Sequence, residues 1–194
     1  RLNLIMQKRK KVYVGFAVDI IHQGHINILK IASSYGIVTV GLLTDKAIAS
    51  YKNIPYLDYK SRKIIVQSIK YVDSVIPQKT LDYVPNLNLI KPDFVVHGDD
   101  WKIGVQKKTR DRVIKAIKKW SGKLIEPKYT KKISSTIIKR KVHKINNLLY
   151  KNKSKLNRKN DLKKINQIIK SYDLLQFPNL PLKKIIELIK NDKN

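Results

Sequence analysis

The strongest constraint on the fold is a regular alternation of apolar, strand-like runs with amphipathic, helix-like runs. The run "KVYVGFA", residues 11–17, is rich in β-branched and aromatic residues, as strands are. The run "INILKIASSYG", residues 26–36, has helical spacing and ends at a glycine, a residue that commonly follows a helix. The next run, "IVTVGLL", residues 37–43, is apolar on both faces, as a strand buried in a parallel sheet is. These three runs predict a βαβ unit.

The same alternation continues toward the C-terminus. Helical and strand-like runs follow one another over about residues 59–70, 74–76, 81–89, 93–97, 105–121 and 123–126. Alternation of this kind is typical of proteins in which helices cover both faces of a parallel sheet. We therefore predict an α/β fold with a Rossmann-like, doubly wound parallel sheet.

After Glu126 the pattern changes to basic amphipathic segments. Residues 133–150 begin with serine and threonine, which favour helix starts, and then space apolar residues on one face. A charged break near residues 151–160 and two further amphipathic segments, separated by a proline turn, follow. A chain of 194 residues has room for one domain with a full core. We predict this domain over residues 1–140 and a basic amphipathic helical extension over residues 141–194.

The chain is strongly basic, with 42 Lys and Arg against 14 Asp and Glu and a formal net charge of +28. Such a charge is compatible with a polyanionic partner. The excess is nearly all lysine, however, and lies along the whole chain, whereas arginine, the usual reader of base edges, is sparse. Lysine, isoleucine and asparagine together are also what an A/T-biased coding sequence produces. We therefore expect no specific nucleic-acid partner, and a phosphate-rich small substrate fits the charge as well.

Two absences narrow the functional classes. The chain has no cysteine, which excludes disulfides, thiolate metal sites and cysteine nucleophiles. The most apolar N-terminal run, "VYVGFAVDII", is interrupted by Asp19 and lacks a small-residue cleavage site, and no apolar run reaches membrane-spanning length. We expect a soluble, cytoplasmic protein without a membrane span.

Two of the four histidines flank a glycine at the first strand-to-helix junction, as His22, Gly24 and His25. Ligands of open α/β sheets bind beyond the carboxyl ends of the strands, where this junction lies. The start of the following helix offers free N–H groups and a positive dipole end, and a glycine permits close approach of a phosphate to the backbone. Imidazoles donate hydrogen bonds to phosphoryl oxygens. The pattern favours a phosphate cradle.

Other interpretations of the histidines are weaker. A zinc site would need a third ligand, and the remaining histidines, His97 and His143, are distant in sequence. A serine hydrolase would carry a G-x-S-x-G elbow, which the sequence lacks. Histidines packed in the core remain an alternative, although two of them in one turn at such a corner would be a coincidence.

Four segments in a fixed order carry a resemblance to a known family. The segment "GFAVDIIHQGH", residues 15–25, resembles the H-x-G-H signature of the cytidylyltransferase-like nucleotidyltransferases. "RKIIVQSIKYVDSVIP" is similar to the arginine-bearing helix and Val-Asp strand of that family, "KPDFVVHGDDW" to its G-D-D-W segment, and "ISSTIIKR" to its terminal I-S-[ST]-T signature. On these segments the chain is identified as a member of the family, with residues 1–140 as its nucleotidyltransferase domain.

Three further segments refine the resemblance. "GLLTDKAIASYKNIPYLDY", "TLDYVPNL" and "HGDDWKIGVQKKTR" look most like the nucleotidyltransferase domains found with phosphoenolpyruvate mutases in phosphonate biosynthesis. The chain also resembles glycerol-3-phosphate cytidylyltransferases, but more loosely. The resemblance implies transfer of a cytidylyl group from CTP to a phosphonate such as 2-aminoethylphosphonate, with release of pyrophosphate. Glycerol-3-phosphate, phosphocholine and phosphoethanolamine are the alternative acceptors.

The resemblance also implies Mg²⁺ bound with the triphosphate and few protein ligands to it, and no metal-binding residue is assigned. It further implies a homodimer. A function of another class stays open, in which the inherited fold is a basic, non-enzymatic module that binds nucleic acid. That class is motivated by the charge of +28. It predicts tight binding to any duplex, with a steep dependence on salt.

By resemblance, each site residue has an expected role. His22 and His25 stabilise charge on the α-phosphate, and Lys46 is a further candidate phosphate contact. Lys52, which contacts the triphosphate, and Arg62, which contacts either the acceptor substrate or a phosphate, complete the catalytic set. The expected nucleotide-binding residues are Gly15, Phe16, Ala17, Asp19, Gly24, His97, Gly98, Asp100, Trp101, Ile133, Ser134, Ser135 and Thr136.

Three of these residues, Lys52, Arg62 and Trp101, have a plain structural alternative. Asp100 is expected to accept a hydrogen bond from cytosine or ribose, and Ser134 to Thr136 to hold the β- and γ-phosphates. The alternatives are a solvated surface lysine for Lys52, an ion pair on the helix surface for Arg62, and core packing for Trp101.

The sequence departs from the family pattern just before "ISST". Many members have Arg-Thr-x-Gly there, whereas this chain has "YTKK", so Tyr129 and Lys132 stand in place of the arginine and the glycine. A tyrosine at the first position fits the phosphonate-associated group. We expect Lys132 either to add a phosphate contact or to disturb the loop.

Overall fold

The structure is a computed structural model and describes residues 9–51 and 55–150. The chain divides into two compact units, Arg1–Ile138 and Lys139–Asn194, and each is considered by itself. Within the described residues, no helix is both long enough and apolar enough to cross a membrane. The amphipathic segments predicted beyond residue 150 lie outside the described residues.

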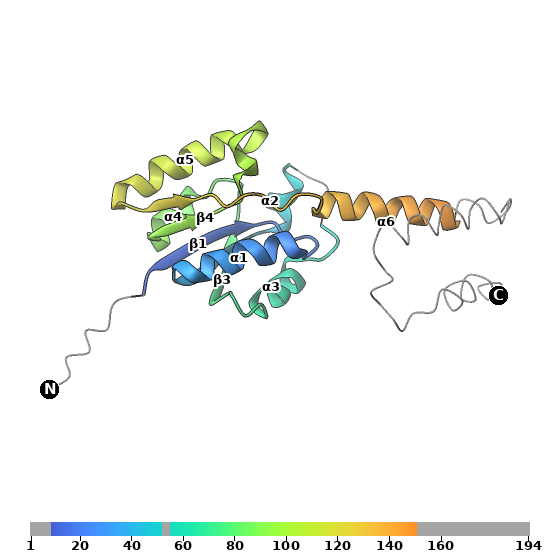
Figure 1. Cartoon of the computed structure of the whole chain (residues 1–194), viewed down its shortest axis with the longest axis horizontal. Coiled ribbons are helices and arrows are strands. Elements are labelled where there is room, and N and C mark those ends of the chain that lie inside the picture. Colours follow the sequence, from blue (N-terminus) through green and yellow to red (C-terminus); the bar gives the residue numbers. More distant parts are fainter. Residues whose placement is uncertain (1–8, 52–54, 151–194) are drawn as a thin grey trace. The chain divides into compact units, whose positions relative to one another are not determined.

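The first unit is built on a five-stranded parallel sheet in the order β3-β2-β1-β4-β5. The strands are β1 (Lys11–Phe16), β2 (Ile37–Leu43), β3 (Ser74–Gln78), β4 (Phe94–Val96) and β5 (Lys123–Ile125). From β1 the chain adds β2 and β3 on one side of the sheet and then β4 and β5 on the other side. The strand order therefore reverses between β1 and β4, which lie side by side (Figure 1). This arrangement confirms the predicted doubly wound parallel sheet, and the switch between β1 and β4 is where such sheets bind ligands.

Helices follow the strands in the predicted alternation. They are α1 (Gln23–Tyr35), α2 (Asp45–Ala49), α3 (Tyr59–Gln67), α4 (Val84–Ile90), α5 (Lys107–Ile117) and α6 (Ser135–Tyr150), with 3₁₀ turns η1 (Asp99–Lys102), η2 (Gly104–Gln106) and η3 (Lys118–Trp120). Helix α4 begins later than its apolar spacing predicts. The side chains of Thr80 and Asp82 bond the backbone N–H groups of Asp82 and Val84, which holds these residues in a turn.

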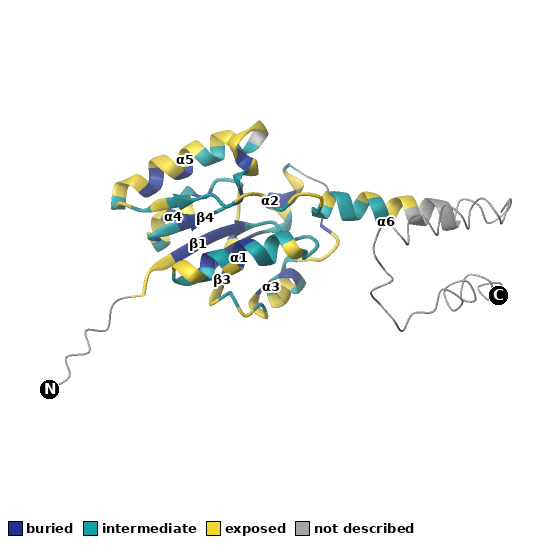
Figure 2. Cartoon of the chain, in the orientation of Figure 1, coloured by how far each residue is buried: buried dark blue, intermediate teal, exposed yellow. Residues whose placement is uncertain are grey.

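The two faces of the sheet bury separate cores (Figure 2). Val12 and Val14 of β1 belong to the core that contains α1 and α3, whereas Tyr13 points to the core that contains α4 and α5. Consecutive residues of one strand thus enter opposite layers, because side chains alternate along a strand. This explains why β1 and β2 are apolar on both faces.

Helix α1 ends at Gly36, as its position in the sequence predicts. Gly36 has φ 153°, and a Cβ there would overlap the carbonyl oxygen of Lys10. The same carbonyl accepts a hydrogen bond of 2.8 Å from the N–H of Ile37. The chain therefore turns directly from α1 into β2 beside the start of β1, which aligns the carboxyl ends of these two strands at one edge.

Candidate active site

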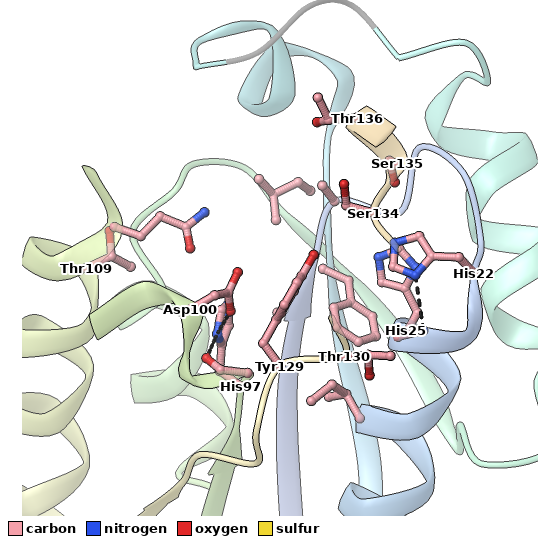
Figure 3. A pocket seen from close by; sticks show the side chains of 18 of the residues that line it. His22, His25, His97, Asp100, Thr109, Tyr129, Thr130, Ser134, Ser135 and Thr136 are labelled. Atoms are coloured by element: carbon pink, nitrogen blue, oxygen red, sulfur yellow. Dashed lines mark hydrogen bonds and ion pairs between the residues drawn. The ribbon is translucent and has the colours of Figure 1, made fainter. Parts of the chain in front are cut away.

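A pocket opens at the carboxyl ends of β1 and β4, where the sheet order reverses. Four parts of the chain carry most of the residues that line it (Figure 3). They are the end of β1, the start of α1, the connection from β4 through η2 into α5, and residues 129–136 at the start of α6. The segments that carry the H-x-G-H, G-D-D-W and I-S-S-T signatures thus meet in one place.

His22 and His25 lie together at the mouth of α1. Their rings stack with centroids 3.9 Å apart and planes 29° from parallel, and the ring of Phe16 packs edge-on against His25 at 5.0 Å. His22 is the N-cap of α1, because its Nδ1 accepts a hydrogen bond of 3.1 Å from the N–H of Gly24. Both side chains line the pocket, as the spacing of the two histidines predicts.

The cap bond of His22 determines which ring nitrogen carries the proton. A nitrogen that accepts a hydrogen bond has no proton, so in the neutral ring the proton is on Nε2. Burial lowers the pKa of His22 below its usual value, which favours this neutral form. His22 therefore presents an N–H donor at Nε2, as a phosphate contact requires.

Gly24 packs closely against the side chain of His22, which caps α1. A Cβ at Gly24 would lie 3.0 Å from the Cε1 and Nδ1 atoms of His22 and 3.6 Å from the Cβ of Thr130. The first of these contacts is closer than ordinary van der Waals packing allows. A larger residue would push the His22 ring away from its cap position.

Two hydrogen bonds tie the start of α6 and the loop before it to α1 and to the loop that precedes α1. The hydroxyl of Ser135 donates to the carbonyl oxygen of Ile20 at 3.2 Å, and the side-chain amide of Asn27 donates to the hydroxyl of Thr130 at 3.1 Å. Ser134 caps α6 by accepting a bond of 3.1 Å from the N–H of Ile137. The free N–H groups at the start of α6 therefore share the pocket with the histidines, in a position suited to an anion.

His97, at the end of β4, forms the opposite wall. Its ring stacks almost parallel on the indole of Trp101, with centroids 3.9 Å apart and planes 11° from parallel. Its Nδ1 lies 2.8 Å from the carbonyl oxygen of Gly98 and 3.8 Å from a carboxylate oxygen of Asp100. His97, Gly98 and Asp100, which the sequence predicts to bind the nucleotide, all line the pocket.

Trp101 itself lies behind this wall and not in it. Its side chain is 1 % exposed, and its Nε1 donates to Glu126 at 2.8 Å. Arg110 holds the same carboxylate through two bonds of 2.7 and 2.9 Å. These bonds hold the pKa of Glu126 at about 2, with Arg110 as the main cause. The expected direct contact of Trp101 with the nucleotide is thus replaced by core packing that supports His97.

Arg62 differs more from its expected role. Its side chain is fully buried, and its guanidinium bonds the carbonyl oxygens of Ala17 at 2.6 Å and Leu57 at 3.1 Å and the carboxylate of Asp45 at 2.6 Å. It does not line the pocket. A buried guanidinium is stable when carbonyls and a carboxylate satisfy its donors, and here they occupy all three of its nitrogens. Arg62 therefore positions the end of β1 instead of contacting a phosphate.

Three other predicted residues, all of them described by the structure, do not line the pocket. Asp19 accepts a bond of 2.7 Å from the N–H of Tyr56, and the carbonyl oxygen of Ile133 accepts one of 3.3 Å from the hydroxyl of Tyr129. Lys46 is exposed on α2. Lys52 lies outside the described residues. Its role stays a prediction.

Lys132 occupies a left-handed backbone conformation, with φ 65°. Glycine adopts this conformation without the steric cost that a Cβ brings. This explains physically why the family pattern has a glycine here. The loop keeps the left-handed turn in this chain, and the lysine side chain is exposed.

The structure adds lining residues that were not among the predicted site residues. Ile28 lies in α1 and Leu43 ends β2, and the others come from later segments: Tyr51, Leu81, Tyr83, Gln106, Thr109, Tyr129 and Thr130. Among the described residues that line the pocket there is no lysine or arginine. The described part of the chain also has no cluster of three or more His, Cys, Asp or Glu that could hold a metal ion.

Comparison with known proteins gives one family. A profile described as "Cytidylyltransferase-like" matches residues 13–141. The "Ethanolamine-phosphate cytidylyltransferase" of Dictyostelium discoideum is 36% identical over 135 residues, which cover 67% of this chain and 36% of that protein. The "Glycerol-3-phosphate cytidylyltransferase" of Bacillus subtilis (strain 168) is 35% identical over 101 residues, which cover 48% of this chain and 74% of that protein.

These matches span different shares of the relatives. The matched region is about a third of the length of two ethanolamine-phosphate enzymes, at 36% and 32%, and about three quarters of the glycerol-3-phosphate enzyme, at 74%. Among solved structures, the lipopolysaccharide core biosynthesis protein from Thermoplasma volcanium GSS1 aligns with a TM-score of 0.53 and 24% identity, covering 63% of this chain and 98% of that one. This structural likeness confirms the fold.

Proposed function

Because the chain belongs to the cytidylyltransferase-like family, we propose that it transfers the cytidylyl group of CTP to a small phosphate-bearing acceptor and releases pyrophosphate. The observation that carries the proposal is the meeting of His22, His25 and the start of α6 in one pocket. A donor pair beside a helix N-terminus is the arrangement that a reacting triphosphate needs.

In this proposal an oxygen of the acceptor attacks the α-phosphorus of CTP. The new bond joins this oxygen to the α-phosphorus, and the bond from the α-phosphorus to the oxygen that bridges to the β-phosphate breaks. Pyrophosphate leaves with that electron pair. A phosphate acceptor is already an anion near neutral pH, so no strong general base is needed, and the rate depends on positioning and on stabilising charge.

The residues divide the work of binding a triphosphate. His22 donates from Nε2 to an oxygen of the α-phosphate, where negative charge increases in the transition state, and His25 lies stacked beside it. The free N–H groups and hydroxyls at Ser134 to Thr136 bind the β- and γ-phosphates. The wall at His97 and Asp100 faces the nucleoside.

Mg²⁺ is expected to bind together with the triphosphate and to neutralise part of its negative charge. The described residues offer no cluster of three or more metal-ligating side chains, so this part of the chain does not provide a dedicated magnesium cage. The phosphate oxygens would be its main ligands.

For the acceptor we propose a phosphomonoester of the phosphoethanolamine or glycerol-3-phosphate kind. The names of the relatives support this, because they are an ethanolamine-phosphate and a glycerol-3-phosphate cytidylyltransferase. A phosphonate such as 2-aminoethylphosphonate is the second candidate. It is favoured by the three segments at residues 41–59, 80–87 and 97–110 that resemble phosphonate enzymes.

An acceptor panel tests the proposal. The purified chain is incubated with CTP, Mg²⁺ and, in turn, phosphoethanolamine, glycerol-3-phosphate, phosphocholine and 2-aminoethylphosphonate, and pyrophosphate release is followed. We expect turnover with a phosphomonoester, abolished when CTP is omitted. Turnover limited to 2-aminoethylphosphonate would replace the first acceptor by the second. Turnover with ATP and an unrelated acid, and none with CTP, would contradict cytidylyl transfer.

A further inference from the structure

The position of the proton on His97 follows from its contacts. A carbonyl oxygen can only accept, so the 2.8 Å contact between Nδ1 of His97 and the carbonyl oxygen of Gly98 is a bond donated by Nδ1. The carboxylate oxygen of Asp100, 3.8 Å from the same nitrogen, is a second acceptor on that side. A neutral imidazole has one N–H, so Nε2 of His97 is a hydrogen-bond acceptor. This is the reverse of His22.

The ring of His97 is also fixed in orientation. It stacks on Trp101 at 3.9 Å, and Trp101 is held by Glu126, which Arg110 clamps with two bonds. Turning the ring over would put the Cδ2–H group in place of Nδ1, and the hydrogen bond to the carbonyl oxygen of Gly98 would be lost. The acceptor at Nε2 is therefore preorganised.

This acceptor is available to a ligand in the pocket. His97 lines the pocket, and 13% of its side-chain surface is exposed. In the part of the chain that the structure describes, the His97 ring forms its hydrogen bond through Nδ1. Nε2 is thus the polar ring atom that remains for a bound molecule.

We propose that His97 selects the base, by accepting a hydrogen bond at Nε2 from the exocyclic amine of cytosine. The inference rests on the proposed transfer from CTP and assigns its nucleotide specificity to one atom. Cytosine presents an amine where uracil presents a carbonyl oxygen. UTP would therefore place an acceptor against the acceptor at Nε2, leaving both groups without a partner in a partly buried site.

The selection should depend on pH, because protonation of His97 would turn Nε2 into a donor. Burial lowers the pKa of His97, although the carbonyl oxygen of Gly98 and the carboxylates of Asp100 and Glu126 oppose this shift. Among the described residues, the phenol ring of Tyr83 also lies against the His97 ring, with ring centroids 6.3 Å apart. Near neutral pH the ring is neutral and favours cytosine, and in acid the protonated ring favours the carbonyl oxygen of uracil.

Equilibrium binding of CTP and UTP to wild type, His97→Phe and His143→Phe tests the proposal. Phenylalanine keeps the stack on Trp101 but has no acceptor. We expect the ratio of the UTP and CTP dissociation constants to fall by about tenfold in His97→Phe, the effect of one lost hydrogen bond. His143 is exposed on α6, and its variant should keep the wild-type ratio. An unchanged ratio in His97→Phe with normal thermal unfolding would overturn the proposal.

A second measurement needs no variant. The same ratio is measured for wild type from about pH 8 down to the lowest pH at which the protein stays folded, because burial moves the titration of His97 below the usual range of histidine. Contacts to the triphosphate are common to both nucleotides and cancel. We expect the preference for CTP to fall with pH, and a constant ratio would overturn the proposal.

Pyrophosphate release separates this inference from the proposed function. Wild type that prefers CTP in binding and yet transfers nothing to any acceptor contradicts the function and leaves the role of His97 intact. Transfer from CTP and UTP in the same ratio by wild type and His97→Phe contradicts the role of His97 alone.

Discussion

At the residue scale, the two walls of the pocket present histidines with opposite proton positions. Nδ1 of His22 accepts from the N–H of Gly24, so its Nε2 donates, whereas Nδ1 of His97 donates to the carbonyl oxygen of Gly98, so its Nε2 accepts. Burial keeps both rings neutral near neutral pH by lowering their pKa values. One backbone contact at each ring thus decides whether it suits a phosphate oxygen or an amine.

Removing the donor of His22 should slow the reaction more than it weakens binding. For His22→Ala we expect kcat to fall by about 10²- to 10³-fold with a small change in KM, the usual effect of losing one preorganised donor. Steady-state kinetics with CTP check this. Alanine also removes the cap of α1, which costs about 1 kcal/mol, so thermal unfolding is measured in parallel. A higher KM with unchanged kcat would contradict the role.

Replacing Lys132 by glycine should stabilise the protein slightly. Lys132 has φ 65°, and the left-handed conformation costs roughly 1–2 kcal/mol for a residue with a Cβ. Glycine removes this cost, but it loses more conformational freedom on folding than lysine does, which offsets roughly 0.5–1 kcal/mol of the benefit. We therefore expect the free energy of unfolding to rise by up to about 1 kcal/mol. Urea unfolding measures it. Lys131→Gly is the control and should give no gain, because Lys131 is not among the described residues with positive φ.

At the element scale, single buried groups join helices to the strand ends that form the pocket. Arg62 of α3 bonds the carbonyl oxygen of Ala17 just beyond β1, and Glu126 just beyond β5 joins Trp101 of η1 to Arg110 of α5. These bonds connect elements that are far apart in sequence. The pocket walls are therefore held by the layers behind them.

The bond network of Arg62 should be far more important for stability than a surface pair. We expect Arg62→Met to lower the free energy of unfolding by about 3 kcal/mol or more, because it leaves carbonyl groups and Asp45 without their partner. Arg112→Met is the matched control. Arg112 pairs with Asp82 at 3.5 Å with 64% of its side chain exposed, and such pairs contribute about 0–1 kcal/mol. If urea unfolding gave the same loss of free energy for Arg62→Met and Arg112→Met, the stabilising role of the Arg62 network would be wrong.

Glu126 should contribute to acid unfolding. Its pKa is lowered from 4.5 to about 2 in the folded protein, so its stabilising effect is fully present above the ordinary value and is lost as pH falls through about 2. Glu126→Gln should lower the free energy of unfolding at neutral pH and flatten its decline below the ordinary pKa. Urea unfolding at a series of pH values tests this, and a variant that keeps the wild-type slope would show that the pair is unimportant.

At the scale of the whole molecule, the sequence predicted the architecture better than the partners within it. The alternation of strand-like and helix-like runs was sufficient to predict the doubly wound sheet. The spacing of His22, Gly24 and His25 was sufficient to predict a pocket at the point where the strand order reverses. Hydrophobic periodicity indicates which face of an element is buried, and a phosphate site requires particular residues at short spacing. Both signals lie within short stretches of sequence, so they can be recognised without the tertiary structure.

The remaining contacts depend on residues that the fold brings together. The sequence near Arg62 does not indicate that its partners are Ala17 and Asp45, which are 45 and 17 positions away. Trp101 likewise meets Glu126 across 25 positions. A charged or aromatic residue beside a motif can equally contact the ligand or support a residue that does, and only the tertiary structure separates the two.

The overall charge of +28 also leads to a prediction at this scale. The proposed enzyme should bind CTP specifically, and saturation at a hundred times the dissociation constant should raise the free energy of unfolding by about 2.7 kcal/mol. Duplex DNA should bind weakly at physiological salt. Tight duplex binding with a steep salt dependence, and no rise in melting temperature with CTP, would instead favour a basic nucleic-acid-binding module.

The pocket wall is shared among separate connections, and this has a practical consequence for redesign. The connection from β4 to α5 carries His97 and Asp100, while the connection from β1 to α1 carries His22 and His25. A mutant library confined to residues 97–110 would therefore vary the wall proposed to face the nucleoside and leave unchanged the wall proposed to bind the phosphates. Altered donor preference could be selected there without changing His22 and His25.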